Sequence, residues 1–398
     1  MSAAILRDAR RVRFAALPPL SLYVHLPWCV RKCPYCDFNS HEVGRNARGA
    51  LGDLPEREYL AALMRDLEGL LPSVWGRRIH SIFIGGGTPS LFSAGAIDEL
   101  LAGIRARLQV DPEAEVTLEA NPGTAEAARF RGYRGAGVNR LSLGVQSFND
   151  AMLQALGRIH TADEARRAIG MALETFGSVN IDLMYGLPGQ TREMARADIE
   201  EGVREGTAHL SAYQLTIEPN TVFYSRRPAL PGHDASADMQ LAVEETLRGA
   251  GFEHYETSAF ARPGARCRHN LNYWEFGDYL GIGAGAHGKL SFADRVTRHE
   301  QVKQPREYLG AAGELPQRAV TARELPFEFA LNAFRLVEGF ERGLYEARTG
   351  LPALTIEAPL RAAEAKGLLE RSGERIRPTE RGRRFLDDLV GLFLAAQE

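Results

Sequence analysis

Three of the chain's four cysteines lie close together in the segment WCVRKCPYCDFNSH at 28–41. Their spacing, Cys29-x3-Cys33-x2-Cys36, suits a metal site, a redox pair or an iron–sulfur cluster, with simple packing as the alternative. Packing is disfavoured because prolines and charged residues surround the thiols, as in an exposed loop after a strand. Structural zinc is also disfavoured, since no second Cys or His pair follows at a finger or ribbon spacing.

An iron–sulfur cluster is the interpretation that these thiols favour. A [4Fe–4S] cluster usually takes four thiolates, so three would leave one iron without a ligand from the chain. Phe38 stands where a fourth cysteine could have followed, and its ring can neither ligate iron nor react as a thiol does. Four cysteines in 398 residues without an export signal also predict a reducing compartment rather than a disulfide framework.

The elements that must position this loop alternate between strands and helices. Short β-branched or apolar runs predict strands at 21–26, 79–86, 114–120, 138–145, 179–186 and 210–216. Amphipathic segments between them predict helices at 56–70, 94–108, 162–176 and 191–205. Six such units predict a parallel sheet, either open and doubly wound or closed partway into a barrel, with its ligands beyond the carboxyl ends of the strands.

The rest of the chain divides into smaller parts. A helix at 234–249 and a strand at 252–260 lead into RCRHNLNYWEFGDYLGIGAGAHG at 266–288. From residue 324 the pattern changes to a helix, a helix at 355–366, a short hairpin at 367–382 and a last helix, which is the order of a winged helix. We therefore expect an N-terminal extension at 1–20, a barrel at 21–235, a segment that extends it at 236–320, and a C-terminal domain at 321–398.

Composition limits the classes of function. Hydrophobic residues make up 44% and charged residues 25%, which is typical of a globular protein, and no apolar run is long enough to span a bilayer. The net charge of −3 gives no overall attraction to nucleic acid or an anionic membrane. The arginine-rich start superficially suits a mitochondrial presequence, but we expect a cytoplasmic extension, and membrane contact only peripherally through a partner.

The motifs LYVHLPWC, CDFNSH, GGGTPS, EANPG, GVQSF, LGRIH and DLMYGLPGQ occur in this order. Together they resemble the radical S-adenosylmethionine (SAM) superfamily, and within it the group of oxygen-independent coproporphyrinogen III oxidase (HemN) and the HemN-like heme chaperones (HemW). The resemblance extends from about residue 22 to the C-terminus. It implies an α/β fold, an incomplete (β/α)6 TIM-like barrel, with a winged-helix-like accessory domain.

The resemblance also implies cofactors and the residues that hold them. Cys29, Cys33 and Cys36 would bind the [4Fe–4S] cluster, whose open iron would take the amino and carboxylate groups of SAM. The implied SAM-binding residues are Tyr23, Gly86, Gly87, Thr88, Glu119, Gln146, Arg158 and Asp182. Such residues offer close backbone approach, a guanidinium for a carboxylate, and acceptors for hydroxyls and amines. Taken singly, each would suit an ordinary turn or capping role.

Two features distinguish between members of the group. The oxidase motif continues to a fourth cysteine near the active site, and here that position is Phe38. The segment HNLNYW, His269 to Trp274, resembles the HNxxYW segment of HemW-type proteins. His269 is therefore a candidate heme ligand, since axial histidine is ordinary in heme proteins, and Cys267 is a weaker candidate. Both features favour the chaperone branch.

Three functions follow from these patterns. The leading one is a heme chaperone that binds a cluster, SAM and heme, and passes heme to acceptor haemoproteins, membrane-associated respiratory proteins among them. The alternative is an oxygen-independent coproporphyrinogen III oxidase that decarboxylates its substrate to protoporphyrinogen IX. For either function the resemblance implies an electron donor for the cluster and assigns no catalytic residue. It leaves open whether the protein forms a homodimer. Arginines at 371–384 could make the winged helix bind DNA, but interspersed glutamates dilute them, and we expect no nucleic-acid partner. The glycine-rich GIGAGAHG at 281–288 is expected to be a rim loop near the cofactor rather than a dinucleotide motif.

Overall fold

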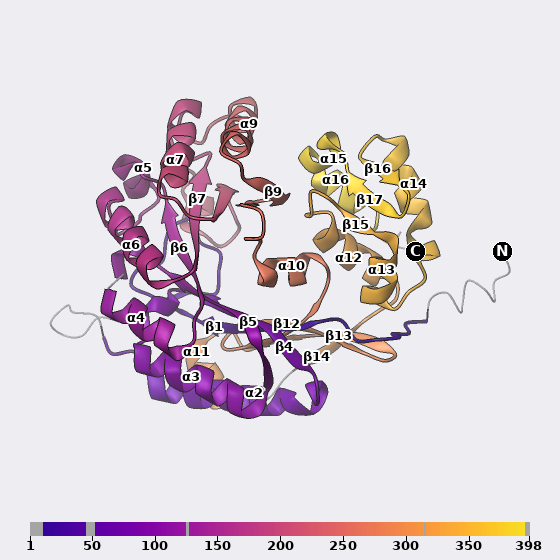
Figure 1. The fold of residues 1–398 in the computed structure, drawn as a ribbon, viewed down its shortest axis with the longest axis horizontal. Helices are drawn as coiled ribbons and strands as arrows, with labels where there is room; N and C mark the ends of the chain where they lie inside the picture. Colours follow the sequence, from indigo (N-terminus) through magenta and orange to yellow (C-terminus); the bar gives the residue numbers. More distant parts are fainter. Residues whose placement is uncertain (1–10, 45–51, 125–126, 312, 314–315, 395–398) are drawn as a thin grey trace.

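The computed structural model describes residues 11–44, 52–124, 127–311, 313 and 316–394. A mixed twelve-stranded sheet within these residues forms the main body, and a smaller domain lies beside it (Figure 1). The strand order is β14-β13-β12-β11-β1-β4-β5-β6-β7-β8-β10-β9. This arrangement curves the sheet around a concave face, and most of the helices lie on its convex side (Figure 1).

Six neighbouring parallel strands form the predicted (β/α)6 partial barrel, so this fold prediction is confirmed. They are β1 Leu20–Leu26, β4 Arg78–Gly86, β5 Gln109–Ala120, β6 Arg140–Gln146, β7 Ser178–Tyr185 and β8 His209–Gln214. The helices that follow or precede them are α2 Glu56–Val74, α3 Ala94–Arg107, α4 Ala127–Ala136, α5 Asp150–Ala155, α6 Ala162–Thr175, α7 Arg192–Arg204 and α9 His233–Gly249.

The two faces of each barrel strand differ in polarity. Leu22 and Val24 on β1 and Ile82 and Ile84 on β4 are fully buried in one apolar cluster with the inner faces of the helices. Burial of each such side chain contributes about 1.5–3 kcal/mol to the stability of the folded state. Alternate residues point the other way, into the concave lumen of the barrel, and many of them are polar. Packing against the helices therefore stabilises the barrel, and the polar side chains of the lumen are available to bind a ligand.

The sheet extends beyond the six predicted strands on both edges. On one side β11 Asp278–Ile282 runs parallel to β1, followed by β12 His287–Phe292, β13 Arg295–Glu300 and β14 Gln317–Val320, which are antiparallel. On the other side the single strand predicted at 252–260 is instead two, β9 Glu253–Glu256 and β10 Ala259–Ala261, which pair with each other. The glycine-rich segment at 281–288 is a loop only in its middle, because its first residues belong to β11 and its last residues to β12.

The C-terminal domain has the helix and strand order of a winged helix. It contains α12 Leu325–Ala333, β15 Phe340–Glu341, α13 Arg342–Thr349, α14 Glu357–Ala365, β16 Leu369–Ser372, β17 Arg375–Pro378, α15 Glu380–Arg384 and α16 Leu386–Gly391. Its own apolar cluster includes Val12, and Arg13 N donates to Gly350 O at 2.9 Å. Residues 1–10 of the expected extension lie outside the described residues. No helix among the residues described combines the length and apolar character needed to span a membrane.

Candidate cluster and cofactor site

The three-cysteine loop leaves the carboxyl end of β1 and is anchored by the glycine-rich end of β4. Gly87 N donates to Leu26 O at 2.9 Å, and Thr88 N donates to Trp28 O at 2.7 Å. A Cβ on Gly87 would lie 2.6 Å from Trp28 O, closer than real Cβ contacts, so only glycine fits there. The glycine motif therefore brings two chain segments together directly at the start of the cysteine loop.

The end of the loop is tied to the barrel as well. Two short strands, β2 Trp28–Cys29 and β3 His41–Glu42, pair with each other and close the loop. His25 Nε2 lies 2.8 Å from Asn39 O, while Asn39 Nδ2 donates to Ala284 O at 2.9 Å. Phe38, between these two strands, is 62% exposed.

A polar side chain lies beside each cysteine thiol. Cys29 Sγ accepts a hydrogen bond from Thr88 Oγ1 at 3.5 Å, and Cys33 Sγ accepts one from Arg158 Nη1 at 3.5 Å. Cys36 Sγ lies 3.7 Å from Ser40 Oγ. Burial raises the pKa of Cys29 to about 11 and also raises that of Cys36, so bound iron would have to displace their protons.

A cluster and a single metal ion require different arrangements of the three thiols. Within the described ranges, no three Cys, His, Asp or Glu side chains converge closely enough to hold one metal ion. A cubane cluster is held by thiolates spaced more widely than the ligands of one ion, because each thiolate binds a different iron. Three soft sulfur donors on one anchored loop are the donor set that the iron–sulfur interpretation requires.

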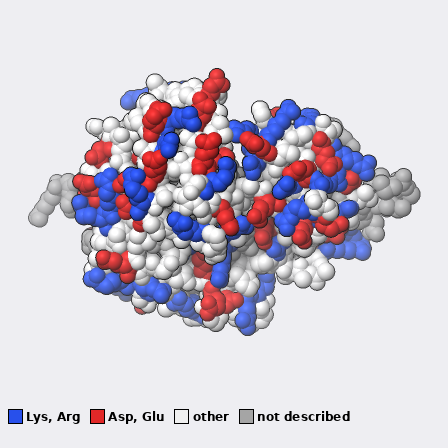
Figure 2. Space-filling model, turned by 45° about the horizontal axis from the view of Figure 1, so that its top comes forward, with Lys and Arg blue, Asp and Glu red and all other residues white. Residues whose placement is uncertain are grey.

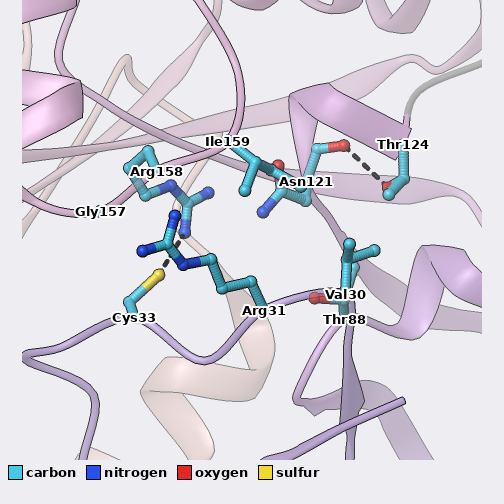
Figure 3. Close-up of a pocket in the computed structure, with 9 residues that line it drawn as sticks. All are labelled: Val30, Arg31, Cys33, Thr88, Asn121, Thr124, Gly157, Arg158 and Ile159. Atoms are coloured by element: carbon cyan, nitrogen blue, oxygen red, sulfur yellow. Dashed lines mark hydrogen bonds between the residues drawn. The ribbon is translucent and has the colours of Figure 1, made fainter. Parts of the chain in front are cut away.

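Arg158 lies beside Cys33 in a small pocket at the rim (Figure 3). Its Nη2 donates to Gly144 O at 2.7 Å, while its buried Nε has no partner among the described residues. The guanidinium of Arg31 reaches toward the same thiol in Figure 3. A buried guanidinium with a free donor favours a bound anion such as a carboxylate.

Two acidic residues predicted for the site face the lumen from neighbouring parts of the sheet. Glu119 Oε2 accepts a hydrogen bond from Gly86 N at 3.1 Å, and Asp182 accepts bonds from Ser142 Oγ and Asn180 Nδ2. Burial, and then the charge of Asp182, raise the pKa of Glu119 to about 7. Burial also raises the pKa of Asp182, so both carboxyls are poised to accept or donate hydrogen bonds to a polar ligand.

Gln146 ends β6 in a left-handed conformation with φ 71°. A non-glycine residue is disfavoured there by roughly 1–2 kcal/mol, and such strain concentrates at functional positions. A Cβ on Gly144 would lie 3.0 Å from Gln146 Nε2 and 3.6 Å from Arg158 Nη2, so these two side chains meet above Gly144. The strained backbone thus aims the Gln146 amide at the same rim as Arg158.

Tyr23 is on the inner face of β1, with its hydroxyl 2.8 Å from His25 Nδ1. Burial raises the pKa of Tyr23 well above its ordinary value, so this phenol stays protonated. Tyr23 also stacks on Phe83 at 6.2 Å, which connects the rim to the interior of the barrel.

His269 is on the short helix α10 Arg268–Trp274, which lies on the concave side of the sheet (Figure 1). Its ring stacks on Phe83 at 4.6 Å, and Tyr273 meets it edge-on at 4.6 Å. Burial lowers the pKa of His269 to about 3, so the imidazole is neutral, as metal ligation requires. Cys267 is buried and donates its thiol proton to Glu115 Oε1 at 3.3 Å.

Several lumen residues were not anticipated from the sequence. Inward positions on β4 to β8 carry Ser81, Glu115, Thr117, Arg140, Ser142, Asn180, His209 and Ser211. A signal for them does exist, because polar residues recur at every second position inside strands that are otherwise apolar. In a parallel sheet covered by helices on one face, that alternation indicates a polar lumen on the other.

Comparison with known proteins agrees with this geometry. The family model of the radical SAM superfamily matches residues 23–201, and that of the HemN C-terminal domain matches residues 320–385. The solved structure of coproporphyrinogen III oxidase (HemN) from Escherichia coli, described as a radical SAM enzyme, superposes with a TM-score of 0.79. That match covers 100% of this chain and 94% of the other at 24% identity, which supports the fold alone. Fold and cysteine loop together define a radical SAM protein.

Two curated relatives identify the family more narrowly. The chain is 49% identical over 384 residues to the heme chaperone HemW of Escherichia coli K12, covering 95% of this chain and 99% of that protein. It is 47% identical over 387 residues to the heme chaperone HemW of Haemophilus influenzae, covering 96% and 99%. The chain belongs to the HemW family.

Proposed function

We propose that the protein is a heme chaperone, which binds heme and passes it to an acceptor haemoprotein. The observation that carries this proposal is the similarity along nearly the whole chain to the Escherichia coli heme chaperone. Phe38 and the HNLNYW segment support the same choice over the oxidase, because each distinguishes the two branches. The acceptors would include membrane-associated haemoproteins, which the chain would reach from the cytoplasm through contact with its partner.

The cofactor set in this proposal is a [4Fe–4S] cluster and SAM. Cys29, Cys33 and Cys36 would hold the cluster, and Arg158 would pair with the carboxylate of SAM. The remaining SAM contacts would come from Tyr23, Gly86, Gly87, Thr88, Glu119, Gln146 and Asp182. Such a pair supplies one-electron chemistry when an external donor reduces the cluster. What the chain itself contributes is the anchored loop, the guanidinium at the rim and the polar wall of the lumen.

His269 is the proposed axial ligand of the heme, and the rings of its own helix would line the porphyrin. Its neutral imidazole supports this role, whereas the thiol of Cys267 is already engaged with Glu115. The ring is only 3% exposed, so α10 would have to shift for iron to reach it. Heme binding is therefore proposed to open the segment that carries the HNLNYW motif.

A nucleic-acid role receives little support from the C-terminal domain. Arg371 pairs with Glu357 and Glu364, while Arg375 and Arg377 pair with Glu341 and Glu370. Basic and acidic side chains also alternate over the face seen in Figure 2. Arginines neutralised in this way lack the positive potential that binding to phosphates requires.

The test is heme retention and transfer by the His269→Ala variant. Protein with reconstituted cluster is loaded with heme, passed through a desalting column, and mixed with apomyoglobin while the Soret band is followed. Wild type should retain heme and transfer it, and His269→Ala should lose most of the retained heme. The matched control is His299→Ala, which removes another buried histidine, on β13, and should keep heme. Equal retention in His269→Ala and wild type would remove His269 from the heme site.

A further inference from the structure

Arg140 is a buried cation for which the described structure provides no direct partner. It is the first residue of β6 and only 4% exposed, and its side chain makes no hydrogen bond or ion pair with the residues described. A guanidinium does not lose its proton inside a protein. A buried charge is normally paired, and removing a partner from such a charge is strongly destabilising. The site around Arg140 is therefore incomplete in the chain alone.

Thr117 is a second donor without a partner at the same place. It lies directly across the ladder from Arg140 on β5, and its fully buried Oγ1 has no hydrogen bond within the described residues. Buried hydroxyls are nearly always hydrogen-bonded, so two unsatisfied neighbours are unusual. Together the guanidinium and the hydroxyl offer a charge and several donors that suit a carboxylate.

The carboxylates nearby do not fill this role. Glu115 accepts hydrogen bonds from the Cys267 thiol and from the backbone N–H groups of Arg268 and His269. Asp182 accepts from Ser142 and Asn180. Their charges attract Arg140 from a distance, but their oxygens are engaged elsewhere.

The site is next to His269 and, like that ring, is buried on the lumen side of the sheet. Phe83 is the ladder partner of Thr117 and stacks on His269, so the three side chains form one wall. Tyr213, on the inward face of β8 with Asp182 and Glu119 as charged neighbours, is nevertheless 41% exposed. Solvent therefore reaches the lumen at β8, and a carboxylate would reach the buried Arg140 and Thr117 only if α10 shifted, as iron binding by His269 also requires.

We infer that Arg140 and Thr117 bind a propionate carboxylate of the porphyrin cargo, beside His269. This inference rests on the proposed function. A carboxylate could also come from SAM, but Arg140 begins β6, whereas Gln146 and the rim with Arg158 are at its other end. The two arginines therefore suit two different carboxylates, one on each ligand.

The test compares heme with heme dimethyl ester, whose propionates carry no charge. Affinities for both are measured by Soret titration of wild type, Arg140→Gln and Thr117→Val, and SAM binding is measured separately. Wild type should prefer heme, and Arg140→Gln should bind heme about tenfold or more weakly while its affinity for the ester is unchanged. Thr117→Val should show a smaller loss in the same direction. SAM affinity should not change in either variant.

A structural control separates loss of fold from loss of binding. Arg77 is a mostly buried arginine that does have a partner, since its Nη2 lies 2.8 Å from Asp278 Oδ2. Arg77→Gln should lower the melting temperature yet keep the preference for heme over its ester. Equal loss for heme and ester in Arg140→Gln, or no loss, would overturn the inference. Failure of wild type to bind either compound would instead reject the proposed function, and a loss confined to SAM would assign Arg140 to that cofactor.

Discussion

Asn39, three residues after the last cysteine of the loop, donates its side-chain amide to the carbonyl of Ala284 at 2.9 Å, and to Lys303 O at 2.8 Å. The glycine-rich turn that accepts the Asn39 amide is itself bound to α2, because Gly283 N donates to Asp66 Oδ2 and Ala284 N donates to Tyr59 Oη. A segment near residue 284 thus positions the cysteine loop near residue 36. The glycine-rich stretch at 281–288 acts here as a clamp on the chain.

Asn39→Ala should release this clamp and reduce cluster assembly. It removes the two bonds to Ala284 O and Lys303 O and the contact of Asn39 Oδ1 with His41 Nε2 at 3.2 Å, each worth about 1 kcal/mol. The chain that follows Cys36 is then free to move. We expect a lower iron and acid-labile sulfide content per chain after anaerobic reconstitution. Asn149→Ala is the control, since it removes the N-cap of α5 at a cost of about 1 kcal/mol but leaves the loop intact. Equal iron content in both variants would contradict the clamp.

Glu119 should make stability depend on pH in a defined direction. Its pKa is about 7 in the folded protein against an ordinary value of 4.5, so the folded state holds its proton more tightly than the unfolded state. The resulting stabilisation is complete below about pH 4.5 and is lost as the pH rises through about 7. Glu119→Gln mimics the protonated form and should match wild type at pH 4, but melt at a higher temperature at pH 8. A difference between the two melting temperatures that does not vary with pH would refute this assignment.

Gln146 should show that backbone strain and cofactor binding are linked. Gln146→Ala keeps a side chain in the left-handed region, whereas Gln146→Gly removes the Cβ that is disfavoured there. We therefore expect the glycine variant to be more stable than the alanine variant by about 1 kcal/mol in urea unfolding. Both should bind SAM more weakly than wild type in equilibrium dialysis. An alanine variant as stable as the glycine variant would show that the conformation is not strained.

The parts of the fold that local pattern determines could be predicted from the sequence. Each of the six barrel strands is a short apolar run bounded by turn residues, and hydrophobic periodicity indicated the main helices between them. The cysteine loop was likewise located by its spacing and by its proline and charged neighbours. Such features depend on residues close together in sequence, where propensity and burial act in the same direction.

The remaining features depend on contacts between distant residues. Nothing in the pattern around Asn39 indicates its bond to Ala284, and nothing near Val12 indicates burial in the C-terminal domain. The strands β11 to β14 were missed because glycines and charged residues interrupt their apolar pattern. These segments form strands because β11 pairs with β1 and the others pair beyond it. Their conformation therefore depends on the assembled sheet rather than on local propensity.

The most direct test of the central claim is one anaerobic assay with two arms. Protein with reconstituted cluster receives reductant and SAM, together with coproporphyrinogen III in one vessel and heme in the other, and porphyrins are separated by chromatography. The chaperone account predicts no decarboxylated product, stoichiometric retention of heme, and transfer of that heme to apomyoglobin. Protoporphyrinogen IX formed over many turnovers would contradict it and identify the protein as an oxidase despite Phe38.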